Sequence, residues 1–135
     1  MSEPVARGAL GERIEAIEAG YEYLLAYAAQ GRPTDEGSNT RDMLAAMHAA
    51  LKGLADVVRP LFSGAPAVSA FLDAVERDAG VAAGAIALVL ARHPIPSALI
   101  DNLNASIHLR ALLTDLFLID QALKTSPRSS SDSRS

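Results

Sequence analysis

The sequence of 135 residues contains no cysteine. This absence excludes disulfide bonds, thiolate metal sites and cysteine nucleophiles, but it does not indicate a compartment. Clustered positive charge is also missing, because 12 Lys and Arg residues face 16 Asp and Glu residues and the formal net charge is −4. Nucleic acids and anionic membranes attract clustered positive charge, so we expect neither of them as a partner.

Long hydrophobic runs are scarce as well. The longest uncharged apolar run covers residues 79–91, between Asp78 and Arg92, whereas a membrane span needs about 20 apolar residues. This run therefore predicts a buried helix. The opening segment, "MSEPVARGALGER", has no apolar core of the kind that secretory signals carry. We expect a cytoplasmic protein.

No segment shows the two-residue alternation of a strand, so the fold class we predict is all-α. Apolar residues instead recur at three- and four-residue spacing between clusters of Pro and Gly. This pattern predicts helices over about 11–30, 40–58, 66–90 and 97–124, and Gly31 stands where a left-handed C-terminal cap is expected. Short connections favour antiparallel neighbours. The predicted architecture is one domain: a flexible N-terminus at 1–10, an antiparallel (up-down-up-down) four-helix bundle at 11–124, and a disordered Ser-rich tail at 125–135.

Two features of the predicted third and fourth helices indicate a homodimer. The helix over 97–124 is apolar on several sides, and such a helix packs on several sides. The helix over 66–90 carries Gly80 and Gly84 in a GxxxG spacing. Glycine costs up to about 1 kcal/mol against alanine in a helix, so a close approach by another backbone is the expected compensation.

Arg110 falls at the centre of the apolar face that Leu103, Ile107 and Phe117 make on the predicted fourth helix. A buried charge needs a partner, because an unpaired one costs several kcal/mol. Asp78 lies at the same height across the third and fourth helices, so we predict an Asp78–Arg110 ion pair. This pair either fixes helix register, or Arg110 binds an anionic small ligand in a cavity of the bundle.

The stretch "AMHAALKGLADVV" resembles the phrase H-x-x-K-G of histidine phosphotransfer modules. In those modules the histidine accepts a phosphoryl group and a nearby basic residue helps to neutralise it. Here Lys52 follows His48 by four residues rather than three, which still places both on one face of a continuous helix. The resemblance implies a phosphoacceptor at His48. The alternative is a solvated basic face that also includes Arg41 and Arg59.

Tyr23 and Tyr27 lie four residues apart on one side of the predicted first helix. An exposed tyrosine pair offers a large contact area with polar tips and so is typical of a partner surface. The alternative is partial burial under the following loop.

The known catalytic and cofactor motifs that we sought are missing, including the glycine-rich phosphate loop, G-x-S-x-G and the His-Glu zinc helix. We expect no cofactor and no metal site. The favoured function is non-enzymatic: an adaptor, chaperone-like accessory or regulatory subunit that binds another protein or itself. The alternatives are the phosphotransfer module using His48 and the ligand-binding bundle with Arg110 in its cavity.

Overall fold

The structure of the chain is a computed structural model that describes residues 3–125. Over that range it is built from helices and contains no strand, so the all-α prediction is confirmed. The elements in order are α1 (Glu3–Ala28), α2 (Thr40–Leu51), α3 (Leu54–Val58), the 3₁₀ helices η1 (Arg59–Phe62) and η2 (Pro66–Val68), α4 (Ser69–Leu90), α5 (Ser97–Asn104) and α6 (Ile107–Lys124).

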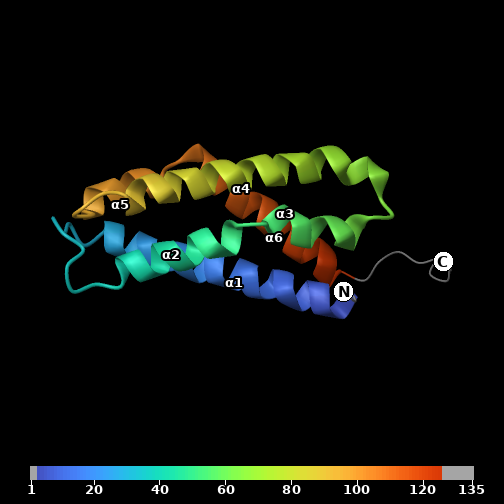
Figure 1. Cartoon of the computed structure of the whole chain (residues 1–135), viewed down its shortest axis with the longest axis horizontal. Helices are drawn as coiled ribbons and strands as arrows, with labels where there is room; N and C mark the ends of the chain where they lie inside the picture. Colours follow the sequence, from blue (N-terminus) through green and yellow to red (C-terminus); the bar gives the residue numbers. More distant parts are fainter. Residues whose placement is uncertain (1–2, 126–135) are drawn as a thin grey trace.

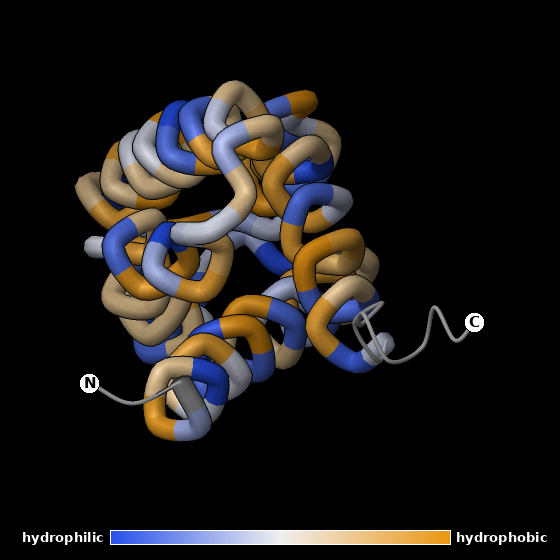
Figure 2. Tube along the Cα trace, turned by 90° about the vertical axis from the view of Figure 1, so that its right-hand side faces the viewer, coloured by the Kyte–Doolittle hydropathy of each residue, from blue (hydrophilic) through white to orange (hydrophobic). Residues whose placement is uncertain are grey.

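The helices enclose one apolar interior (Figure 1). Helix α1 packs against α2 and α5, helix α4 packs against α2 and α6, and the short α3 contacts both α1 and α4. Figure 2 looks along the long axis and shows the helices arranged around this common interior. The arrangement differs from the predicted up-down-up-down bundle, because two of the four predicted helices are broken.

The first break divides the predicted helix over 40–58 at Lys52 and Gly53. Lys52 turns to an extended backbone conformation and Gly53 adopts φ 69°, a left-handed conformation that favours glycine. The guanidinium of Arg13 on α1 donates hydrogen bonds to the carbonyl oxygens of Ala50 and Lys52. These bonds satisfy acceptors that the end of α2 leaves without helical partners.

The second break divides the predicted helix over 97–124 at Ala105 and Ser106. Asn104, the last residue of α5, is buried, and its Nδ2 donates a hydrogen bond of 3.1 Å to the carbonyl oxygen of Leu24 on α1. Ser106 then takes ψ 129°, which a helix does not allow. As a result, α5 packs chiefly on α1 whereas α6 packs chiefly on α4.

The N-terminal part of the chain also differs from the prediction. Helix α1 begins at Glu3 instead of near Gly11, and its first turns bury Ala6 and Leu10. Most of the segment 1–10, which we predicted to be flexible, therefore belongs to this helix. At the other end the description stops at Thr125, so the predicted disordered tail lies, apart from that residue, outside the described residues.

Gly20 and Met47 lie in close contact between α1 and α2. A Cβ atom placed on Gly20 would lie 2.3 Å from Cγ of Met47. Gly80 and Gly84, in contrast, have open space beside them, because a Cβ placed on either residue meets no atom within 4 Å. Within residues 3–125, the GxxxG spacing thus serves no close backbone contact.

Candidate functional site

Large apolar side chains remain exposed on two neighbouring helices, α4 and α6. Ile107, Phe117 and Leu118 of α6 are 75%, 54% and 59% exposed, and Val81 and Leu88 of α4 are 41% and 61% exposed. Side chains of this size are normally buried. We give the name outer face to six of the exposed residues of α6, which are Ile107, Arg110, Thr114, Phe117, Leu118 and Gln121.

An apolar depression adjoins the outer face where the C-terminal half of α6 meets the start of α4. Its volume is about 150 Å³, and the residues that line it are Phe62, Val68, Phe71, Leu72, Leu118, Ile119 and Ala122. Leu118 belongs both to this depression and to the outer face. The apolar surface of α6 therefore continues onto η1, η2 and α4.

Two carboxyl groups meet at the contact between α4 and α6. Asp78 and Asp115 are both half-buried, and Oδ2 of Asp115 is buried with no hydrogen-bond donor among residues 3–125. Burial first, and then the hydrogen bond with Asp78 and its charge, raise the pKa of Asp115 to about 7. Two ionised carboxylates can only accept hydrogen bonds, so this bond exists only while one of the pair is protonated.

Arg110 does not lie where the sequence predicts it. Its side chain is exposed instead of buried, and within residues 3–125 it forms no ion pair with Asp78 or any other residue. The predicted Asp78–Arg110 pair and the predicted ligand cavity around Arg110 are therefore wrong. Asp78 lies against the carboxyl group of Asp115 instead.

The error has a specific physical cause, which is the break before α6. The prediction extended the apolar face of Leu99 and Leu103 through an unbroken helix, and this placed Ile107 and Arg110 inward. The break at Ala105–Ser106 resets the rotation of the helix. The buried residues of α6 are Leu109, Leu112, Leu113, Leu116 and Ile119, so the competing apolar stripe with Ile107 faces outward.

His48 and Lys52 are placed apart by the first break. His48 is half-buried in the last turn of α2, whereas Lys52 lies beyond the end of the helix with an extended backbone. The helical spacing that was to bring the two side chains onto one face therefore does not apply. The phosphotransfer alternative itself stays a prediction.

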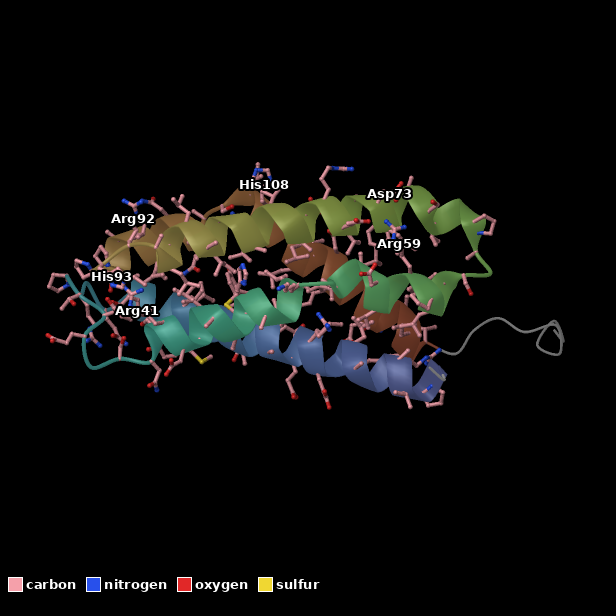
Figure 3. The ribbon with its side chains drawn as sticks, in the orientation of Figure 1. Arg41, Arg59, Asp73, Arg92, His93 and His108 are labelled. Carbon is pink, nitrogen blue, oxygen red and sulfur yellow. The ribbon has the colours of Figure 1, made fainter. Side chains whose placement is uncertain are left out.

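Arg41 and Arg59, two of the basic residues beside His48, are partly exposed and contact other elements of the fold. Arg41 donates a hydrogen bond of 3.0 Å to the carbonyl oxygen of Leu90 and pairs with Asp35. Arg59 pairs with Asp73 at 2.9 Å and with Glu76 at 2.6 Å. Figure 3 shows Arg59 and Asp73 pointing toward one another, and Arg41 beside His93 at the other end of the molecule. These arginines join α2 and η1 to α4.

Tyr23 and Tyr27 do not form an exposed patch. Tyr27 is buried and its hydroxyl donates a hydrogen bond of 2.6 Å to the carbonyl oxygen of Ile95. The ring of Tyr23 stacks on it with centroids 6.4 Å apart, and the Tyr23 hydroxyl lies 3.2 Å from Oγ1 of Thr40. Tyr27 is buried and Tyr23 is half-buried, so the structure contradicts the exposed pair that the partner-surface interpretation requires.

Sequence reasoning missed a polar network in the loops at this end of the molecule. Oδ1 of Asp35 accepts a hydrogen bond of 2.8 Å from the N–H of Ile95, and Oδ2 lies 3.0 Å from Nε of Arg41. The Ile95 bond, supported by Arg41, lowers the pKa of Asp35. The hydroxyl of Ser97 donates to the carbonyl oxygen of Tyr27 at 2.7 Å. The residues of this network lie mostly in loops, so helical spacing in the sequence could not have predicted it. The turn-forming residues around Asp35 are the sequence signal that could have pointed to it.

No known protein family, curated protein or solved structure matches this chain. The helices over residues 3–125 include none with the length and apolarity that crossing a bilayer requires. Nor does this part of the chain bring three or more His, Asp or Glu side chains together in a group that could hold a metal ion.

Proposed function

We propose that this chain is a non-enzymatic helical module that binds protein partners through the outer face of α6 and the adjoining edge of α4. In this role it acts as an adaptor, a chaperone-like accessory protein or a regulatory subunit. The observation that carries the proposal is the exposure of Ile107, Phe117 and Leu118 on one helix. Large contiguous apolar surface on a folded protein is typical of interaction sites, since its burial removes unfavourable contact with water.

The distribution of the exposed apolar residues supports the same surface. Of the seven exposed large hydrophobic side chains among the described residues, five lie on α4 and α6, and the other two, Val5 and Leu25, lie on α1. Scattered single residues of this kind are ordinary, whereas a set on two packed helices is not. The polar residues within and beside the set, such as Thr114 and Arg110, resemble the mixed composition of non-obligate interfaces.

Site-specific photo-crosslinking in the native host tests this proposal. A photoreactive amino acid at position 118 should give discrete crosslinked products, whereas the same amino acid at position 25 should give none or far fewer. Leu25 is the matched control, because it is an exposed leucine on a helix outside the proposed surface. Equal, diffuse labelling at the two positions would contradict the proposal.

A second experiment measures the surface by substitution. Leu118→Glu should abolish the products obtained with the photoreactive group at position 117, because a charge in an apolar contact is costly to desolvate. Leu25→Glu should leave them unchanged. Circular dichroism and thermal melts check that both variants keep the fold, which we expect because both side chains are exposed.

A further inference from the structure

The carboxyl pair of Asp78 and Asp115 has no cation among the residues that the structure describes. Among residues 3–125 the ion pairs involve other carboxylates, and Oδ2 of Asp115 is buried without a donor. A half-buried carboxylate without a donor or cation loses the stabilisation that water would give it. When both groups are ionised, the pair therefore has neither a donor nor a cation unless a positive group reaches it from outside.

Arg110 is a positive group on the same helix that cannot reach this pair. It precedes Asp115 by five residues, and five residues turn a helix by about 140° beyond one full turn. Side chains three or four residues apart are neighbours on a helix, whereas side chains five apart point to different sides. Arg110 is exposed and forms no ion pair within the described part of the chain. Helix α6 therefore carries Arg110 and Asp115 on opposite flanks of its outward side, and neither forms an ion pair among the described residues.

The residues between these flanks follow a coiled-coil spacing. Ile107, Ala111, Thr114 and Leu118 succeed each other at intervals of four, three and four residues, which is the d-a-d-a spacing of a heptad. None of them is fully buried within the chain. In this register Arg110 occupies a g position and Asp115 the following e position. In a parallel pair of helices, a g residue lies beside the e residue of the other helix that comes five positions later.

We infer that a second copy of this chain binds the outer face of α6 through its own α6, parallel and in register. In this arrangement Arg110 of one protomer pairs with the partner's Asp115, and Arg110 of the partner subunit pairs with Asp115 of the first. Ile107, Ala111, Thr114 and Leu118 of each protomer form the apolar seam between them. This inference rests on the surface of the proposed function and names its partner.

Charge complementarity is what selects a second copy in this orientation. A two-fold interface uses the same patch on both protomers, so the patch must complement itself. The parallel pair satisfies this condition twice, once for each Arg110–Asp115 contact. In an antiparallel pair that keeps the seam residues in contact, the flank of Arg110 meets the same flank of the other helix, so Arg110 and the partner's Asp115 lie on different sides of the seam. That orientation therefore loses both Arg110–Asp115 contacts.

The seam is short, so we expect a weak dimer. Four seam residues on a helix of 18 residues form a contact below the size of a standard stable interface. A dissociation constant on the order of micromolar follows from such a contact. Phe117, at the g position after Arg110, extends the contact toward α4 of the partner subunit.

Sedimentation analysis of the purified chain at pH 8 tests the charge pairing. Arg110→Asp and Asp115→Arg should each weaken dimerisation by about tenfold or more. An equimolar mixture of the two variants should form heterodimers, and the double variant should dimerise again to within a few-fold of wild type. Arg92→Asp makes the same charge change at an exposed site outside the seam and should have no effect. A wild type that stays monomeric at about 200 µM, or a mixture without rescue, would overturn the inference.

Cysteine crosslinking tests the register independently of the Asp115 variant, which carries a risk of misfolding. The chain has no cysteine of its own. Ile107→Cys should form a disulfide with itself under mild oxidation, and so should Leu118→Cys, since equivalent seam residues lie within disulfide distance in a parallel pair. Leu25→Cys should not. Disulfides that form only between position 107 of one copy and position 118 of another would show an antiparallel pair and overturn the inference.

The two proposals fail in different ways. If photo-crosslinking at position 118 yields only other proteins and the purified chain is monomeric, the proposed binding function stands and the second-copy inference falls. If position 118 yields no discrete product in the host but the purified chain dimerises as described, self-association stands without a role for other proteins.

Discussion

The carboxyl groups of Asp115 on α6 and Asp78 on α4 lie close enough together that Asp78 raises the pKa of Asp115. The two helices that carry them are in direct contact. A shared proton lets one carboxyl group donate to the other, whereas two ionised groups repel each other in a half-buried place. The packing of α6 on α4 is thus linked to protonation at this one position.

Asp115→Asn should stabilise the dilute, monomeric protein at pH 8 and reduce the loss of stability with rising pH. The pKa of Asp115 is raised to about 7 in the folded chain and is about 3.9 in an unfolded one. A raised acid contributes stability that is fully present below about pH 4 and is lost as the pH rises through about 7. The expected gain at pH 8 is on the order of 1 kcal/mol, since solvent screens a half-buried charge.

Urea unfolding between pH 4 and pH 8 measures this effect. Asp101→Asn is the control, because Asp101 is an exposed carboxylate on α5. A substitution at position 115 that left the pH profile of wild type unchanged would show that the two carboxyl groups do not share a proton.

Asp35→Asn should lower the free energy of unfolding by roughly 1 to 3 kcal/mol at neutral pH, because the Asp35 carboxylate holds both the N–H of Ile95 and the side chain of Arg41. The pKa of Asp35 is lowered in the folded chain. Its contribution is therefore present above its unfolded pKa of about 3.9 and is lost as the pH falls through the folded value.

The variant at position 35 should accordingly lose part of the acid sensitivity of wild type below about pH 4. Acid titration followed by circular dichroism measures it, with Glu36→Gln at a neighbouring exposed carboxylate as the control. Parallel acid unfolding of wild type and Asp35→Asn would argue against this role.

Gly20→Ala should destabilise the protein, although alanine is the better helix former. The added Cβ would lie 2.3 Å from Cγ and 2.5 Å from Sδ of Met47, and overpacking of this kind costs about 1 to 3 kcal/mol. Gly8→Ala on the same helix meets no atom within 4 Å. It should raise stability by up to about 1 kcal/mol. The melting temperatures of the two variants should shift in opposite directions. Equal upward shifts would mean that α1 and α2 are farther apart at Gly20 than the structure shows.

Gly53→Ala should lower the free energy of unfolding by about 1 kcal/mol or slightly more. Gly53 has φ 69° between α2 and α3, and this conformation is about 1 to 2 kcal/mol less favourable for an L-residue. Gly64→Ala is a matched control in a nearby turn without a positive φ. Denaturant unfolding measures both. If Gly53→Ala were neutral, the predicted unbroken helix over 40–58 would regain support.

The sequence by itself determined where most helices lie. Proline and glycine clusters placed the connections, the three- and four-residue periodicity placed the helices between them, and Gly31 adopts the left-handed φ of 63° that its position indicates. Asn39 precedes the first residue of α2, and its side chain makes no capping bond. These features are local, since each depends on the backbone of a few neighbouring residues.

The tertiary structure alone decided which side of each helix is buried and which charges meet. Residues 107–124 carry two apolar stripes, one with Leu109 and Leu116 and one with Ile107 and Leu118, and their periodicity is the same. The contact between Asn104 and Leu24 accompanies a break that turns the first stripe inward. Arg110 thereby moves to the surface and Asp78 meets Asp115 instead. Periodicity fixes the spacing of a stripe, but only packing against α4 fixes its rotation.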